Sequence, residues 1–171
     1  MRILGVDPGL KHTGWALIDE KGKDKGHGVF VPPLKGKQLV NIFLGHILPW
    51  FEAILTLTVP HVVVIEEVQW YGKGRKIMLP LAHVAGALAG LAVFHPTRPK
   101  VYLLLAHQRG HGKRRFGKAW QEHDTDAFWL AQAFLAFDRA LAANDRSYLR
   151  GHAAVGRRSI SVEGAAPGPG S

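Results

Sequence analysis

Two short, continuously apolar runs in this sequence each end in a carboxylate. Residues 3–6 lead into Asp7, and residues 62–65 lead into the pair Glu66 and Glu67. Continuous apolar runs of this length, the second of them strongly β-branched, predict strands that are buried on both faces. A carboxylate at the end of a buried strand is costly unless it is hydrogen-bonded or binds a metal. The two runs therefore predict a buried sheet with acidic side chains at one edge.

The other segments predict a mixed α/β chain. Glycine-rich turns separate the first three strands, which favours an antiparallel meander. Pro49 interrupts the first helix, and Pro80 is expected in the first turn of the second. Strands are predicted at 2–7, 14–18, 28–31, 61–65 and 101–105, and helices at 35–57, 78–94 and 123–143. The order β-β-β-α-β-α-β-α describes a mixed five-stranded sheet with helices on both faces.

Asp7 and Glu66 become neighbours if their two strands are adjacent and parallel. Folds of this kind bind ligands at the carboxyl ends of their strands. Adjacent residues of a strand point to opposite faces, so only one of Glu66 and Glu67 can share a face with Asp7. The register of the neighbouring strand is needed to decide which one.

A third acidic cluster, 122–126, opens the last predicted helix. His123 and Asp126 are three residues apart and share a helical face, whereas Asp124 points away from Asp126. Glu122 lies four residues before Asp126, so helical phase leaves it as an alternative to His123. Asp124 is also a plausible N-cap or first-turn acid, which the helix dipole favours.

This set of acids suits magnesium chemistry. Mg²⁺ binds few protein carboxylates and keeps waters and substrate phosphate in its shell. Two such ions about 4 Å apart activate water and stabilise the leaving oxygen of a phosphodiester. From the residues alone, the candidate metal ligands are Asp7, one of Glu66 and Glu67, and the pair His123 and Asp126 with Glu122 in reserve. Two Mg²⁺ ions are expected.

The composition indicates an anionic partner. The chain has 171 residues and a formal net charge of +9, with a pI near 10.1, which favours nucleic acid. It contains no cysteine, which excludes disulfides, thiolate zinc sites and cysteine nucleophiles. No apolar run reaches the roughly 18 residues of a membrane span. A soluble, cytoplasmic protein without a signal peptide is expected, in a bacterial cell or in a host cell if it is virus-encoded.

The basic residues gather in two loops that flank the proposed metal site in sequence, where they would hold DNA phosphates. A solubilising role is the alternative for them. Trp70 and Tyr71 either stack on an unpaired base or cover the core. Lys11 and His12 can extend this basic track. The candidate DNA-binding residues are Trp70, Tyr71, Lys73, Arg75, Lys76, Arg109, Lys113, Arg114, Arg115 and Lys118.

Two further features concern assembly and the chain end. Gly86 and Gly90 permit close approach of another backbone, either a strand of the same chain or a second subunit. Residues from about 146 to 171 are rich in Gly, Ala, Pro and Ser without periodicity, which predicts a basic, disordered tail. The folded domain is then 1–145.

Three motifs together resemble the RuvC-type Holliday junction resolvases. Residues 3–10 with 13–15 resemble the first motif, 64–67 the second, and His123-x-x-Asp126-Ala127 the last. The resemblance covers roughly residues 1–140, in the order of the family. It implies a ribonuclease-H-like (retroviral-integrase-like) fold, a homodimer, and Mg²⁺- or Mn²⁺-dependent nicking of four-way DNA junctions. It also implies a catalytic role for Asp7, Glu66, His123 and Asp126, and so favours Glu66 over Glu67.

The chain departs from the family pattern in two places. The stretch between the fifth strand and the last helix is about one helix shorter, so the active-site lysines of the family cannot be aligned onto this chain. Gln69 stands where the family often has an intruding aromatic residue. Alternative functions are a ribonuclease H or flap nuclease on the same fold, and a non-catalytic branched-DNA binding protein. An actin-like ATPase is disfavoured because the chain is too short for a second nucleotide-binding half.

Overall fold

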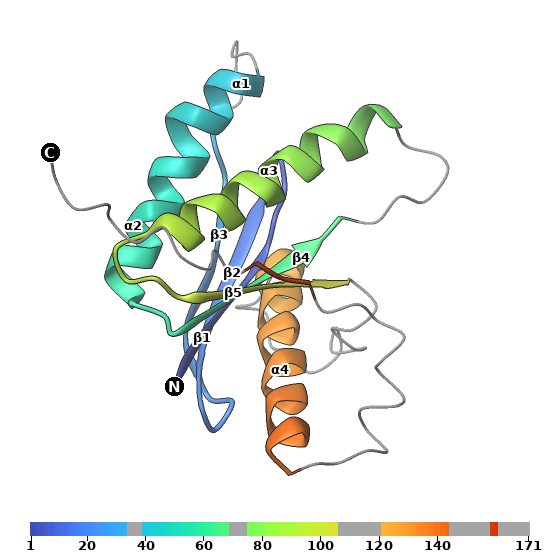
Figure 1. Ribbon diagram of the computed structural model, residues 1–171. Coiled ribbons are helices and arrows are strands. Elements are labelled where there is room, and N and C mark those ends of the chain that lie inside the picture. The colour runs from blue at the N-terminus through green and yellow to red at the C-terminus, as the bar shows by residue number, and fades with distance from the viewer. Residues whose placement is uncertain (34–38, 69–74, 106–120, 144–157, 161–171) are drawn as a thin grey trace, which may run out of the picture.

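The computed structural model describes residues 1–33, 39–68, 75–105, 121–143 and 158–160 (Figure 1). The strands are β1 (Arg2–Asp7), β2 (Thr13–Asp19), β3 (Asp24–Phe30), β4 (Val62–Glu67), β5 (Lys100–Leu105) and β6 (Arg158–Ile160). The helices are α1 (Leu39–Ile42), α2 (Leu48–Thr58), α3 (Arg75–Phe94) and α4 (Glu122–Ala142), with a π-helical turn at Phe43–Ile47. None of the described helices is both long enough and apolar enough to cross a membrane.

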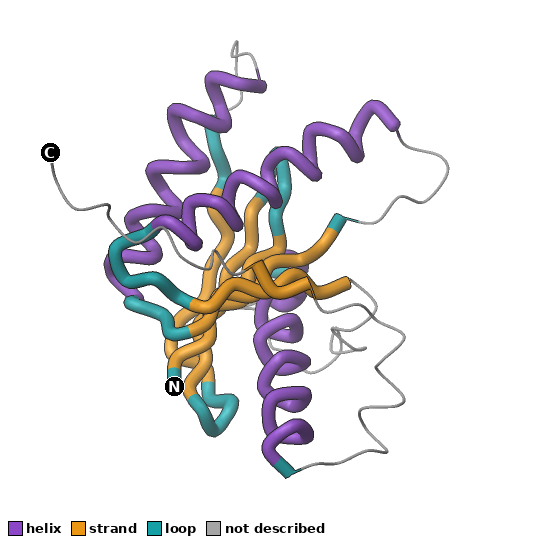
Figure 2. Tube along the Cα trace, viewed as in Figure 1, coloured by secondary structure: helices purple, strands orange, loops and turns teal. Residues whose placement is uncertain are grey.

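The strands form one mixed sheet in the order β3-β2-β1-β4-β5-β6 (Figure 2). The first three strands are antiparallel neighbours, as the meander predicts. Strands β4 and β5 run parallel to β1. The five predicted strands are therefore present, and the adjacency of the two acid-tipped strands is confirmed.

Strand β6 is a correction to the sequence analysis, which predicted five strands and a disordered tail. Residues 158–160 pair antiparallel with β5 and extend the sheet by one strand. The edge of β5 offers unpaired backbone groups that another extended segment can satisfy. The remainder of the predicted tail lies outside the described residues.

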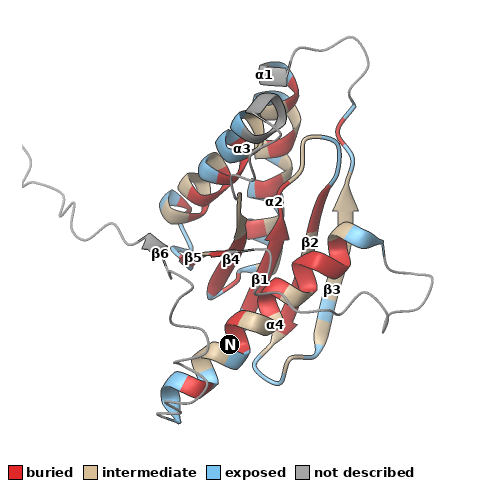
Figure 3. Ribbon diagram, turned by 90° about the vertical axis from the view of Figure 1, so that its right-hand side faces the viewer, coloured by how far each residue is buried: buried red, intermediate tan, exposed pale blue. Residues whose placement is uncertain are grey.

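Helices cover both faces of the sheet, as Figure 3 shows. Helix α4 packs on one face over alternate strand residues that include Ile3, Val62 and Val64. On the other face, α2 and α3 pack over Leu4 and Val63, among others. Along β1 and β4, successive residues pack alternately against α4 and against α2 and α3. Each residue of these two strands therefore faces one of the two helical layers.

The two prolines in the predicted helices behave differently. Pro49 lies at the start of α2, directly after the π-helical turn, so the predicted interruption is confirmed. A proline is tolerated there because the first backbone N–H groups of a helix have no partner within it. Helix α3 starts at Arg75, earlier than predicted, and Pro80 therefore lies inside it rather than in its first turn.

Glycines let α4 lie directly on the sheet. A Cβ on Gly5 would overlap the carbonyl oxygen of Ala127 and lie 3.2 Å from the Cβ of Ala131. A Cβ on Gly14 would overlap the backbone of His123. The first turns of α4 therefore contact the backbones of β1 and β2, which fixes their height above the sheet.

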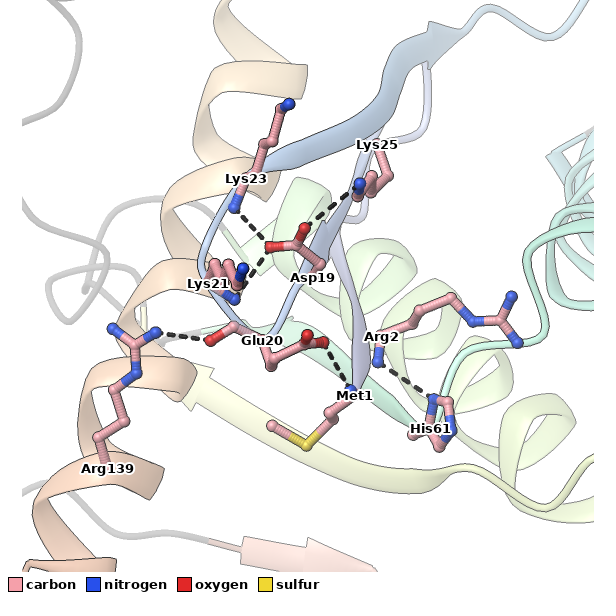
Figure 4. A network of polar contacts seen from close by, with 9 residues as sticks. All are labelled: Met1, Arg2, Asp19, Glu20, Lys21, Lys23, Lys25, His61 and Arg139. Atoms are coloured by element: carbon pink, nitrogen blue, oxygen red, sulfur yellow. Dashed lines mark hydrogen bonds and ion pairs between the residues drawn. The ribbon is translucent and has the colours of Figure 1, made fainter.

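A polar network secures the opposite end of the sheet (Figure 4). The Asp19 carboxylate accepts from the backbone N–H of Lys23 and of Lys21, both at 2.9 Å, and these bonds, Lys23 first, lower its pKa. The Arg139 guanidinium of α4 donates to the backbone carbonyl of Glu20 at 2.6 Å. The β2–β3 turn is thereby bound to the C-terminal half of α4, so that α4 is held at both ends.

Candidate active site

The register of β1 and β4 places Asp7 and Glu66 at neighbouring strand ends. The strands pair from Ile3↔Val62 to Val6↔Ile65, so Asp7 and Glu66 are the next residues along the two parallel strands. Glu66 pairs with Leu104 of β5, which belongs to the layer under α4. Alternation therefore places Asp7 and Glu66 on the α4 face and Glu67 on the opposite face. This register decides between Glu66 and Glu67, a choice that strand alternation alone left open.

His123 contacts Asp7 directly. Its Nδ1 lies 2.7 Å from Asp7 Oδ2, and the Asp7 residue is 9% exposed. An ionised carboxylate can only accept, so Nδ1–H donates and the second ring nitrogen, Nε2, is left for another partner. The first turn of α4 is thus tied to the end of β1, far away in the sequence.

The hydrogen bond to Asp7 raises the pKa of His123 above its ordinary value of 6.5. The negative charges of Asp7, Glu122 and Asp126 act in the same direction, while partial burial opposes them. The electrostatic influence of Glu122 and Asp126 indicates that His123, Asp7 and the acidic first turn of α4 share one negative region.

We expect the raised pKa of His123 to appear in an NMR titration of the metal-free protein. The folded state holds the proton more tightly than the unfolded chain, so the stabilisation is complete below pH 6.5 and is lost as pH rises through the raised pKa. Because the side chain is 38% exposed, the effect on unfolding free energy should stay below about 1 kcal/mol. Asp7→Asn should return the pKa toward 6.5. A wild-type His123 that titrates at or below its ordinary value would contradict the pairing.

Two acids of α4, Asp124 and Asp126, are more deeply buried than surface helix-cap residues. Asp126 is 6% exposed and Asp124 is 2% exposed, and Oδ1 of Asp124 has no hydrogen-bond partner among the described residues. Asp124 does lie in the first turn, as predicted, and the residue before the helix, Gln121, makes no side-chain cap. Glu122 is exposed.

The metal-free arrangement is only partly assembled. Within the described ranges, no group of three or more His, Asp or Glu side chains is placed to hold one metal ion. Asp7 and His123 are in contact, Asp7 and Glu66 lie at neighbouring strand ends, and Asp126 acts electrostatically on His123. The four side chains come from three neighbouring elements, and their role in metal binding stays a prediction.

Most predicted DNA-binding residues lie outside the described residues, namely Trp70, Tyr71, Lys73, Arg109, Lys113, Arg114, Arg115 and Lys118. Arg75 and Lys76 begin α3 instead of lying in a loop. Helix α3 therefore starts shortly after β4 ends, so Arg75 and Lys76 still lie in the segment that follows Glu66.

Sequence reasoning missed the residues that hold the site together. No local pattern marks Gly5 and Gly14 as contact points for α4, although Ala127 and Ala131 opposite Gly5 are a signal of close packing. The sequence places His12 only in a basic track. Its ring stacks on that of His123, with centroids 5.4 Å apart and an interplanar angle of 15°. No local pattern connects these two distant histidines.

Comparison with known proteins identifies relatives. No family model matches the chain. A protein of Methylorubrum populi named crossover junction endodeoxyribonuclease RuvC is 30% identical over 177 residues, which cover 98% of this chain and 91% of the relative. Proteins of the same name from Hyphomonas neptunium and Caulobacter sp. are 39% and 35% identical over 100 and 105 residues. These two matches cover 54% of this chain and only 56% and 59% of the relatives.

Solved structures show the same fold. The structure titled Thermus thermophilus RuvC has a TM-score of 0.63 and 16% identity, and it covers 92% of this chain and 100% of that chain. The T. thermophilus RuvC described as a complex with Holliday junction substrate has a TM-score of 0.66 and 20% identity over 81% of this chain and 95% of that chain. These matches establish the ribonuclease-H-like fold. Together with the near full-length Methylorubrum relative, they show that this chain belongs to the RuvC family of crossover junction endodeoxyribonucleases.

Proposed function

We propose that this chain is a structure-selective endonuclease that resolves four-way (Holliday) DNA junctions by paired symmetric nicks. The observation that carries the proposal is the parallel pairing of β1 and β4, whose next residues on the α4 face are Asp7 and Glu66. The hydrogen bond from His123 to Asp7 joins the first turn of α4 to the same point. Membership of the RuvC family and the net charge of +9 support a DNA substrate.

The residues present fit a divalent metal site by their donor chemistry. Carboxylate oxygens and an imidazole are ligands that Mg²⁺ and Mn²⁺ accept. Nδ1 of His123 hydrogen-bonds to Asp7 Oδ2 at 2.7 Å, which leaves Nε2 as the ring nitrogen that could bind a cation. Asp7, Glu66, His123 and Asp126 would hold the ions. Bound there, two divalent cations would activate water and stabilise the leaving oxygen of a phosphodiester.

The side chains themselves perform distinct tasks in this proposal. Asp7 and Glu66 project from hydrogen-bonded strands, so their positions are set by the sheet. Without metal, the Asp7 carboxylate accepts a hydrogen bond from Nδ1–H of His123. The protonated imidazole is then the cationic partner of this nearly buried carboxylate. The direct backbone contact of α4 at Gly5 and Gly14 holds His123 and Asp126 over the strand ends. Such preorganisation lets the site act without rearranging its backbone.

The substrate class is tested with three labelled nucleic acids of equal length: a mobile four-way junction, an RNA–DNA hybrid and a linear DNA duplex. In Mg²⁺ the chain should cut the junction with two nicks placed symmetrically on opposite strands, and it should leave the duplex intact. Preferential cutting of the hybrid would identify a ribonuclease H instead. Binding of the junction without any product in Mg²⁺ or Mn²⁺ would identify a non-catalytic branched-DNA binding protein.

We propose further that the chain acts as a homodimer through an open face of α3. Residues 79, 83, 86 and 90 are three or four apart and share this face. Leu79 is 56% exposed, and a Cβ at Gly86 or Gly90 would meet no atom of the described residues within 4 Å. None of the described strands therefore packs against these two glycines, so that sequence alternative is wrong for the part of the chain that the structure describes. A twofold dimer would present two sites to a symmetric junction, which explains paired nicks.

Gly86→Arg should convert the dimer to a monomer, because a charged side chain would be buried between the subunits. Light scattering after gel filtration measures the mass. Leu57→Arg is the matched control, since Leu57 lies on α2 and is 79% exposed, and it should remain dimeric. The monomeric variant should also lose the symmetry of its nicks. A wild-type chain that is monomeric at all concentrations would refute this assembly.

A further inference from the structure

The loop between β1 and β2 is closed so that His12 is held over the candidate site. The Thr13 hydroxyl donates to the carbonyl oxygen of Gly9 at 2.9 Å, and the Gly9 N–H lies 3.5 Å from the same hydroxyl. A Cβ on Gly9 would overlap the carbonyl oxygen of His12. Thr13 is fully buried. Any larger residue at position 9 would force this loop open, so the backbone of His12 is fixed relative to Asp7.

The ring of His12 covers the ring of His123 within this geometry. The two imidazoles are nearly parallel, at 15°, with centroids 5.4 Å apart, which is a stacked arrangement. His12 itself is exposed, while His123 is of intermediate exposure. The hydrogen bond from Nδ1 to Asp7 holds one edge of the His123 ring. The stacked His12 ring contacts the face of the same ring and restricts its tilt.

We infer that His12 is a positioning residue for His123, and through it for the metal site. The inference deepens the proposed function and rests on it. His12 fixes the plane of the His123 ring by stacking, and Asp7 fixes its Nδ1. Together they determine the direction of Nε2 before any ligand arrives. Outer residues that orient a ligating histidine in this way commonly change metal affinity by about 10- to 100-fold when they are removed.

The test compares His12→Ala, which removes the ring, with His12→Phe, which keeps a planar ring without nitrogen. In the metal-free protein, the Nδ1–H signal of His123 should be protected in the wild type and in His12→Phe, and should be lost to exchange in His12→Ala. The dissociation constant for Mn²⁺, measured by calorimetry, should rise about tenfold in His12→Ala and return to the wild-type value in His12→Phe. Junction affinity is measured without metal in all three proteins, so that any contact of His12 with DNA is detected separately.

Two outcomes would overturn the inference. Unchanged NMR signals and Mn²⁺ affinity in His12→Ala would show that the stack positions nothing. If His12→Phe restored neither the NMR signals nor the Mn²⁺ affinity, and also lost junction affinity, His12 would instead act on DNA through its ring nitrogens. A wild-type chain that binds no Mn²⁺ would refute the proposed function instead, and the Nδ1–H signal would still decide whether His12 orients His123.

Discussion

Asp7→Asn is expected to abolish junction nicking and to leave junction binding intact. The amide keeps the shape of the side chain but removes the charge that would hold a cation at the end of β1. A loss of at least about a thousandfold in the single-turnover rate is expected, which corresponds to about 4 kcal/mol of transition-state stabilisation. Rates are measured on a fluorescent four-way junction in Mg²⁺, and binding is measured by gel shift in Ca²⁺.

The chain offers a matched control for this substitution. Asp24 on β3 also pairs with a histidine, since its Oδ2 lies 2.9 Å from Nδ1 of His27. Asp24→Asn removes an Asp–His pair of the same kind away from the candidate site, and it should cut at the wild-type rate. Asp7→Asn protein that nicks as fast as Asp24→Asn protein would show that Asp7 does not take part in the reaction.

Gly5→Ala is expected to impair both stability and cleavage. The new Cβ would overlap the carbonyl oxygen of Ala127, so α4 must shift away from β1. Overpacking of a close backbone contact typically costs about 1–3 kcal/mol of unfolding free energy. A shift of α4 also moves His123 and Asp126 relative to Asp7 and Glu66, and misplacement of about 1 Å can lower a rate about a hundredfold.

Urea unfolding and single-turnover nicking measure the two effects of Gly5→Ala. Gly45→Ala is the control, because a Cβ on Gly45 in the π-helical turn meets no described atom within 4 Å. That substitution should be neutral or should stabilise the protein by up to about 1 kcal/mol. Equal behaviour of the two variants would mean that contact of α4 with β1 does not control the site.

The strands that carry the acids could be predicted because their physical requirement is simple. A run such as 62–65, apolar at every position, must be buried on both faces, and the polar residue that follows must lie at the sheet edge. Helical phase likewise grouped His123 with Asp126. The choice between Glu66 and Glu67 needed the pairing of β4 with β1, because alternation fixes only that one of them faces α4.

Other features depend on contacts that no local pattern encodes. Residues 158–160 lie in a stretch without periodicity, and they become a strand only because β5 offers an open edge. The stack of His12 on His123 joins residues from opposite ends of the domain. The start of α3 at Arg75 places Pro80 inside the helix, which helix propensity disfavours and tertiary packing overrides.

Anomalous scattering from Mn²⁺ in crystals of the metal-loaded wild-type chain would locate the cations directly. We predict two peaks between the ends of β1 and β4 and the first turn of α4, with Asp7, Glu66, His123 and Asp126 as their ligands. Absence of any peak at this position, under conditions in which the same protein cuts a junction with Mn²⁺, would contradict it.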